Sequence, residues 1–306
     1  MDRYFLFRPK PFDCETLSSY IQRVSIRNLI SPDDIWRTFT KKKYTNNQNC
    51  ISIKLDVNPN SVFDLSSFEN SLMLENGTLK KMSLFSLIDA KINFNLESTS
   101  NTYSFVRNFF VTHRRYCPMC LNERQAYKLI WQIKGIDFCM IHKVPLVSSC
   151  PKCNKKILLL AKNGQVGVCS FCDHKLQTIE DYNYVINKQE NILYETWDYL
   201  MTENTPKLKK ISGLSYKETL CIKIIYFMRK LSYNSIENHF GYIIEGNDNE
   251  YIIPFELVID LLMKTQHTIS EFINEDIPIK FIKYISSKDI TKYNNLVKLK
   301  NSLLLI

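Results

Sequence analysis

The sequence predicts a mainly α-helical protein with small zinc-ribbon modules at its centre. Four pairs of cysteine or histidine, each with two residues between the ligands, lie between positions 117 and 172. Capped stretches with apolar residues at helical spacing lie on both sides, and 45% of the 306 residues are hydrophobic, enough to build cores. We therefore expect an N-terminal helix-turn-helix-like domain (1–112), two central zinc fingers (113–178) and a C-terminal helical domain (179–306).

The N-terminal region reads as a series of short helices. The first follows Asp13, a good N-cap residue, and its apolar side chains recur at helical spacing: Leu17, Tyr20, Ile21 and Val24. A second begins at Ser31 as cap with Pro32 in its first position. Further helices are expected over 64–74, 79–90 and 102–111. Short helices with polar connections fit a helix-turn-helix domain, and a helical bundle with no DNA role fits the same pattern.

The eight ligand candidates predict two zinc sites. The pairs are Cys117/Cys120, Cys139/His142, Cys150/Cys153 and Cys169/Cys172. Two residues between ligands let one tight turn aim both side chains at one ion, and two such turns complete the tetrahedron that Zn²⁺ takes with thiolate and imidazole. The first two pairs read C-x₂-C-x₁₈-C-x₂-H and the last two C-x₂-C-x₁₅-C-x₂-C, which is ribbon-like spacing.

Two questions about these sites are open at this point. Neighbouring pairs can share a zinc in sequence order, or the pairs can alternate in a cross-braced arrangement. We favour the sequential order, because each gap is long enough for a small hairpin. His174 lies two residues beyond Cys172 and is an alternative ligand there.

The stretch 128–139 between the first two pairs alternates in polarity and predicts a strand or hairpin, with Trp131 in the core.

The predicted zinc ions are structural, two per chain. A catalytic zinc keeps one ligand position open for water, whereas both sets here are complete.

The N-terminus has no long apolar run typical of a signal peptide, and no stretch approaches the ~20 apolar residues that span a membrane. We expect a cytoplasmic protein without a membrane segment. In a reducing compartment, clustered cysteines are metal ligands rather than disulfides.

The C-terminal region again reads as helices in series. Ser215 and Glu218 form a predicted capping box before a wide apolar stripe, and Thr268 and Glu271 form another. Helices are expected over 215–231, 234–241, 253–266, 268–278 and 286–306.

Three basic runs are candidate contacts for nucleic acid or an acidic protein surface. The formal net charge is +9, which suggests an acidic partner. The runs are Lys41, Lys42 and Lys43; Arg114 and Arg115; and Lys207, Lys209 and Lys210. For any single run, a solvated surface is the more ordinary explanation. Among the three, Arg114 and Arg115 are the best candidates, because the adjacent zinc turn would hold their backbone in place.

No sequence feature indicates an enzyme. The chain has no phosphate-binding G-x-x-x-x-G-K-[ST], no G-x-G-x-x-G and no G-x-S-x-G. The acidic residues are scattered, so they do not define a catalytic set. We expect a non-enzymatic protein that binds partners.

Residues 114–153, "RRYCPMCLNERQAYKLIWQIKGIDFCMIHKVPLVSSCPKC", resemble the signature of the TniQ/TnsD family of transposon target-selection proteins. That signature runs roughly R-Y-C-P-x-C-L, then an aromatic residue and a tryptophan, then C-x-x-H and L-x-x-x-C-P-x-C. The opening "FRPKPFDCETLSSYIQRVS" also resembles the start of the family, and "EDIPIKFIKYI" resembles a late segment more faintly. The resemblance is specific over 114–172 and weaker elsewhere.

The resemblance implies a DNA-integration protein that does no chemistry itself. Such proteins join whatever marks the target site to an AAA+ ATPase regulator, which then recruits the transposase. Shorter TniQ members of CRISPR-associated transposons dock as a homodimer on an RNA-guided, Cascade-like complex. Longer TnsD-like members bind an attachment-site DNA sequence directly. The moderate length and two zinc modules favour the shorter kind. Many lysines and few arginines also favour an adaptor over a base-reading protein.

Overall fold

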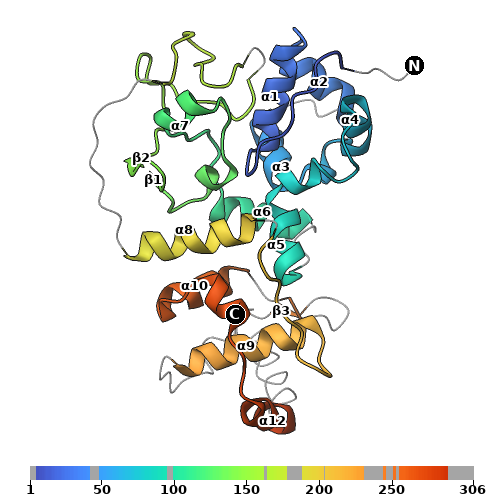
Figure 1. The fold of residues 1–306 in the computed structure, drawn as a ribbon, viewed down its shortest axis with the longest axis vertical. Helices are drawn as coiled ribbons and strands as arrows, with labels where there is room; N and C mark the ends of the chain where they lie inside the picture. The colour runs from blue at the N-terminus through green and yellow to red at the C-terminus, as the bar shows by residue number, and fades with distance from the viewer. Residues whose placement is uncertain are drawn as a thin grey trace, which may run out of the picture. The chain divides into compact units, whose positions relative to one another are not determined.

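The protein is mainly helical, and its C-terminal region is helical too (Figure 1). Two clusters of cysteine and histidine lie in the central part of the sequence. The computed structural model describes residues 5–41, 48–94, 99–161, 164–177, 188–202, 204–230, 244–245, 251–252 and 255–288. Among the helices in these ranges, none has both the length and the apolar content needed to cross a lipid bilayer. The expected fold class is confirmed.

The chain divides into two compact units. Unit 1 comprises Met1–Leu87, Leu96–Tyr194 and Met201–Glu203, and unit 2 comprises Ile88–Asn95, Glu195–Leu200 and Asn204–Ile306. The N-terminal helices and both cysteine clusters lie in unit 1, so the expected boundary between 112 and 113 falls inside a single unit. The domain limits expected at 112/113 and 178/179 stay predictions.

The described residues of the N-terminal part of unit 1 form the helices α1 (Leu17–Arg27), α2 (Pro32–Phe39), α3 (Gln48–Val57) and α4 (Leu65–Leu72). The N-cap of α1 is Thr16, whose hydroxyl accepts from the Ser19 amide, and not Asp13 as expected. The cap of α2 is as expected: Ser31 and Asp34 form a reciprocal capping box. Helix α1 contacts α2 and α3, and α2 contacts α4.

The core of these helices is rich in phenylalanine. Phe68 of α4 lies 4.9 Å from Phe39 and 5.4 Å from Phe63, measured between ring centroids, and the Phe63 pair is T-shaped. Such geometry places the positive edge of one ring on the negative face of the other. The apolar stripe expected on α1 is buried here, as Leu17, Tyr20, Ile21 and Val24 all have 0% exposure.

The connection to the cysteine clusters contains two 3₁₀ turns and two further helices. These are η1 (Pro59–Ser61), η2 (Lys80–Met82), α5 (Leu84–Ile92) and α6 (Thr99–Phe109). They confirm the helical character expected over 79–90 and 102–111. Helix α6 contacts α3 within unit 1.

The central region has little regular structure outside its metal-ligand turns. It contains α7 (Pro118–Glu123), η3 (Leu129–Gln132), β1 (Phe138–Cys139) and β2 (Val144–Pro145), and the two strands pair antiparallel. The strand expected over 128–139 is mostly wrong: Leu129–Gln132 forms a 3₁₀ turn with all four residues buried. In a strand with one face to solvent, buried and exposed side chains alternate. Here four successive side chains are buried, so the segment does not follow that pattern. Trp131 is in that core as expected.

Unit 2 contains most of the C-terminal helices. The chain continues through α8 (Lys188–Met201), α9 (Tyr216–Lys230), the antiparallel pair β3 (Ile244–Glu245) and β4 (Tyr251–Ile252), α10 (Phe255–Thr265), α11 (Ile269–Asn274) and α12 (Ile279–Lys288). Both predicted capping boxes, at Ser215 and Thr268, are present. The helix expected over 234–241 lies outside the described residues, as does 289–306 of the last expected helix.

An aromatic core and the buried Lys223 contribute to the packing of unit 2. Trp197 contacts Phe255 at 5.3 Å and Phe227 contacts Phe272 at 5.0 Å, between ring centroids. Lys223 of α9 is 4% exposed and its Nζ donates to the carbonyls of Phe272, Ile273 and Glu275. The ammonium group therefore satisfies carbonyls at the C-terminal end of α11 that no helical amide can reach. Burial lowers the pKa of Lys223 to about 8.

Candidate metal centres

The first cluster brings together Cys117, Cys120, Cys139 and His142. The His142 Nδ1 atom lies 3.5, 3.3 and 3.7 Å from the sulfurs of Cys117, Cys120 and Cys139, and the sulfurs of Cys120 and Cys139 are 3.6 Å apart. A tetrahedral zinc with Zn–S of about 2.3 Å and Zn–N of about 2.0 Å requires S···S and S···N separations of roughly 3.8 and 3.5 Å. The four ligand atoms therefore fit a single zinc ion.

The second cluster brings together Cys150, Cys153, Cys169 and Cys172. The sulfurs of Cys150 and Cys172 are 3.6 Å apart, and those of Cys153 and Cys169 are 3.7 Å apart. These separations also match the edges of a thiolate tetrahedron around zinc. In each cluster, the four ligand atoms lie within 4.8 Å of one another.

The pairs are grouped in sequence order, which confirms the sequential arrangement over the cross-braced one. His174 is not among the grouped ligands, so Cys172 holds that corner. Each cluster supplies four protein ligands, and a four-coordinate ion held this way has no position for water or substrate. The donor chemistry and the separations support structural metal ions, which would connect distant parts of the chain.

Three of the four ligand pairs use one kind of turn. The carbonyl of the first ligand accepts a hydrogen bond from the amide four residues later: Lys143 to Cys139, Asn154 to Cys150 and Asp173 to Cys169, at 2.7, 2.8 and 3.0 Å. Lys143, Asn154 and Asp173 directly follow the second ligand and have φ between 52° and 56°. Asn and Asp adopt this left-handed conformation at the lowest cost among non-glycine residues. The turn aims both ligand side chains to the same side.

The fourth pair is positioned by a helix. Cys117 is the N-cap residue of α7, Pro118 occupies its first position, and Cys120 lies one turn along. Proline suits this position, because it has no amide hydrogen to leave without a partner. The Leu121 amide donates to the Cys117 carbonyl at 3.0 Å. The helical turn thus replaces the left-handed turn of the other pairs.

A carboxylate orients the histidine ligand. The His142 Nε2 atom lies 2.8 Å from Glu123 Oε1, while Nδ1 faces the three sulfurs. A carboxylate that accepts from the second ring nitrogen fixes the tautomer and raises the basicity of the ligating nitrogen. Spacing rules find ligands but not such partners, so Glu123 was missing from the sequence prediction.

We expect Glu123→Ala to weaken zinc binding at the first cluster by about 10- to 100-fold, because His142 loses the group that orients it. Competition with a chromogenic zinc chelator measures this change. Glu123→Gln, which keeps an acceptor oxygen without the charge, should lie between Ala and wild type. Glu75→Ala, an exposed change in the same unit, is the control. Unchanged chelator competition in Glu123→Ala would show that this contact does not support the metal.

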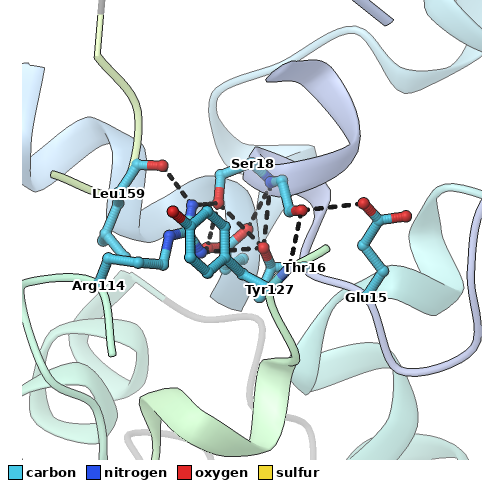
Figure 2. Close-up of polar contacts among 8 residues, drawn as sticks. Glu15, Thr16, Ser18, Arg114, Tyr127 and Leu159 are labelled. Carbon is cyan, nitrogen blue, oxygen red and sulfur yellow. Dashed lines mark hydrogen bonds and ion pairs between the residues drawn. The ribbon is translucent and has the colours of Figure 1, made fainter. Parts of the chain in front are cut away.

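Arg114 joins the second cluster to the N-terminal helices (Figure 2). Its side chain has 0% exposure, and its guanidinium donates to Thr16 Oγ1 at 3.0 Å, to Ser18 Oγ at 2.7 Å and to the carbonyl of Leu159. Leu159 lies between the two ligand pairs of the second cluster. The guanidinium also lies 4.4 Å from the Tyr127 ring centroid, a cation–π distance.

The charge of Arg114 is balanced by Asp56 at the end of α3. The two side chains are fully buried, and Arg114 Nη1 lies 3.8 Å from Asp56 Oδ2. Asp56 also accepts from the amide and hydroxyl of Ser18 at 2.8 and 2.7 Å. Burial raises the pKa of Asp56 and lowers that of Arg114, so removal from water works against both charges. The charged form of each side chain is therefore stabilised by the charge of the other.

Arg115 is buried in the same segment but faces the first cluster's loop. Its Nε donates to the Trp131 carbonyl at 2.7 Å, and its other nitrogens reach the Ile133 carbonyl and the Asp137 carboxylate. Both Arg114 and Arg115 had been expected at the surface as a contact for nucleic acid or a partner. That expectation is wrong, because these side chains are 0% and 6% exposed and satisfy groups of this chain.

The remaining basic runs are exposed where the structure describes them. Lys41 is exposed and its Nζ donates to the Asn60 carbonyl. Lys42 and Lys43 lie outside the described residues. In unit 2, Lys207, Lys209 and Lys210 are exposed around the buried Leu208. These lysines remain candidates for contact with an acidic partner.

Residues 6–146 match the TniQ family model, so this part of the chain is a TniQ domain. The matched region contains the first cluster and Arg114, and it ends before Cys150, so the second cluster lies beyond it. TniQ is a family of transposition accessory proteins that are generally non-catalytic. No curated protein matches the chain.

Proposed function

We propose that this chain, which carries a TniQ domain, is a target-selection adaptor of a transposon and carries out no chemistry itself. The observation that supports this most is the domain match over residues 6–146. The adaptor would link an RNA-guided, Cascade-like CRISPR complex to an AAA+ ATPase regulator, and through it to the transposase. This finer assignment comes from the sequence resemblance to the shorter TniQ proteins.

The geometry of unit 1 supports an adaptor role. Two four-ligand clusters and the buried Arg114 network would give unit 1 a rigid frame, and a metal ion in either cluster would have no open coordination position. A rigid surface loses less conformational entropy when it binds a large partner than a loosely ordered one does. Exposed lysines in unit 2 add attraction for nucleic acid or acidic protein surfaces.

Co-purification tests the proposal. The tagged protein, expressed in cells that carry the whole transposon, should retain the AAA+ regulator and a guide-RNA complex. Cells in which the guide RNA is deleted are the control, and there the RNA-guided complex should be lost. Recovery of the protein with none of the element's other proteins would contradict the adaptor function.

The second candidate is a TnsD-like protein that recognises an attachment site directly. The net charge of +9 favours DNA contact of some kind. Binding to duplexes with and without the attachment site, at two salt concentrations, separates the two functions. Steep salt dependence without sequence preference supports the adaptor, whereas clear preference for one sequence at both salt concentrations supports direct recognition.

We expect the protein to form a homodimer, an expectation that rests on the family resemblance. A pair in which each subunit meets the opposite end of the other closes with twofold symmetry and leaves no free binding end. Light scattering at micromolar concentration should give twice the mass of the 36.1 kDa chain. A mass equal to a single chain would contradict it.

A further inference from the structure

Unit 1 has a basic groove, and none of the eight candidate metal ligands lines it. It encloses roughly 450 Å³ among α3, η1, α6 and the residues that follow α6. Its walls include Ile53, Val106 and Phe110, and Ser61, Thr102 and Thr112 also line it. This volume is within the range of sites that hold small organic groups such as a nucleoside.

The groove is lined by positive charge. Lys54 of α3, Arg107 of α6 and Lys134 all line it, and none of the described residues that line it carries a carboxylate. Lys134 Nζ donates to the Arg107 carbonyl at the end of α6, which holds this charge at the rim. None of the three belongs to the basic runs predicted from the sequence. An anionic ligand therefore meets three cations without an opposing acid.

An exposed aromatic ring stands beside these charges. Tyr103 lines the groove and is 73% exposed, the most exposed aromatic side chain among the large exposed hydrophobic residues of the described chain. Tyr103 and Arg107 are four residues apart on α6, so both lie on the same face of the helix. The groove thus combines apolar walls, a flat exposed ring and cations within one site.

We propose that this groove binds single-stranded nucleic acid, with one unpaired base against Tyr103 and the apolar walls and the flanking phosphates near Lys54, Arg107 and Lys134. Aromatic rings that stack on bases, set beside cations that follow the backbone, are what single-strand sites combine. A duplex offers no free base face to the ring. A run of acidic residues would satisfy the charges but has no aromatic ring to stack on Tyr103. The proposal stands independently of which partner complex the protein serves.

The ring is tested with a fluorescently labelled oligothymidylate and the full-length, zinc-loaded protein. Tyr103→Ala should weaken binding, measured by anisotropy, by roughly 5- to 150-fold, the factor that loss of one stacked base gives. Tyr103→Phe keeps the ring and should bind like wild type, whereas Tyr103→Leu keeps apolar bulk and should bind like Tyr103→Ala. Tyr216→Ala, at another exposed tyrosine, is the control. Circular dichroism should show all variants folded, because Tyr103 is largely exposed.

The cations are tested through the salt dependence of the same binding. Affinity should fall with salt, and Arg107→Gln and Lys54→Gln should each make that fall less steep. The slope of log affinity against log salt should decrease in magnitude by about 0.7, the value for one phosphate contact on a single strand. Lys280→Gln, an exposed change in unit 2, should leave the slope unchanged.

Three results would overturn the proposal. The first is oligothymidylate binding that Tyr103→Ala and Arg107→Gln leave at the wild-type level, or no binding at all. The second is tighter binding of a leucine-containing polyglutamate peptide than of the oligonucleotide, lost in Tyr103→Ala, which would assign the groove to an acidic protein segment. The proposal is also overturned if the protein binds duplex and single strand with equal affinity and Tyr103→Ala changes neither.

Discussion

Cys150→Ser is expected to remove one of two zinc ions per chain and to unfold the second metal cluster. The Cys150 side chain is buried and its sulfur lies 3.6 Å from that of Cys172. A serine hydroxyl stays protonated near neutral pH and does not replace a thiolate. Structural zinc binding contributes about 10–16 kcal/mol to the folding of small zinc modules. The free energy of unfolding of a whole domain is only about 5–15 kcal/mol, so losing most of the zinc-binding free energy is enough to unfold the cluster.

The unfolding should extend beyond the second cluster. The Leu159 carbonyl accepts from Arg114, and the Gly167 amide donates to the Tyr127 hydroxyl at 3.1 Å. Both contacts join the loop between Cys153 and Cys169 to the TniQ domain. When this loop unfolds, Arg114 and Tyr127 lose partners in the core of unit 1. We therefore expect a lower thermal transition and lower solubility of the whole protein.

Elemental analysis and thermal circular dichroism measure these two effects. Wild type should hold two zinc ions per chain and the variant one, and treatment with a strong chelator should lower the transition of wild type towards that of the variant. Cys14→Ser makes the same atomic change in unit 1 outside both clusters and is the matched control. A Cys150→Ser protein with two zinc ions and the wild-type transition would contradict a structural site at Cys150.

The metal ligands were predictable because their geometry is local. Two residues between ligands define a turn, and that turn is encoded within four or five positions, as for Cys150 to Asn154. The sequential grouping also follows from short connections. The helix caps at Ser31, Ser215 and Thr268 were predicted for the same reason, since a capping box spans four residues.

Contacts between distant segments were not predictable in this way. Arg114 meets Thr16, 98 residues earlier in the chain, and Leu159, 45 residues later. Arginine is rarely buried unless it is paired, so a pair of arginines without visible partners reads as surface charge. Asp56 is the partner, but nothing near it in the sequence marks it as buried. The groove at Tyr103 likewise forms only when α3 and α6 lie together.

Arg114→Met is expected to destabilise unit 1 by about 3–5 kcal/mol, the cost of leaving the buried Asp56 without its counter-charge. Methionine keeps most of the length and apolar volume of the arginine stem, so packing changes little. Thr16, Ser18 and the Leu159 carbonyl lose a donor at the same time. Thermal unfolding with zinc present should show a decrease on the order of 10 °C.

The interaction between Arg114 and Asp56 can be separated from the loss of either side chain by a double-mutant cycle. Asp56→Asn alone should also be costly, because it leaves Arg114 buried without an anion. The double variant should then be less destabilised than the sum of the two single changes, since no unpaired charge remains. Arg27→Met, at an exposed position in the last turn of α1, should change stability by less than about 0.5 kcal/mol. Strict additivity across the cycle, or an Arg114→Met protein as stable as Arg27→Met, would show that the buried pair does not hold the second cluster to the helices.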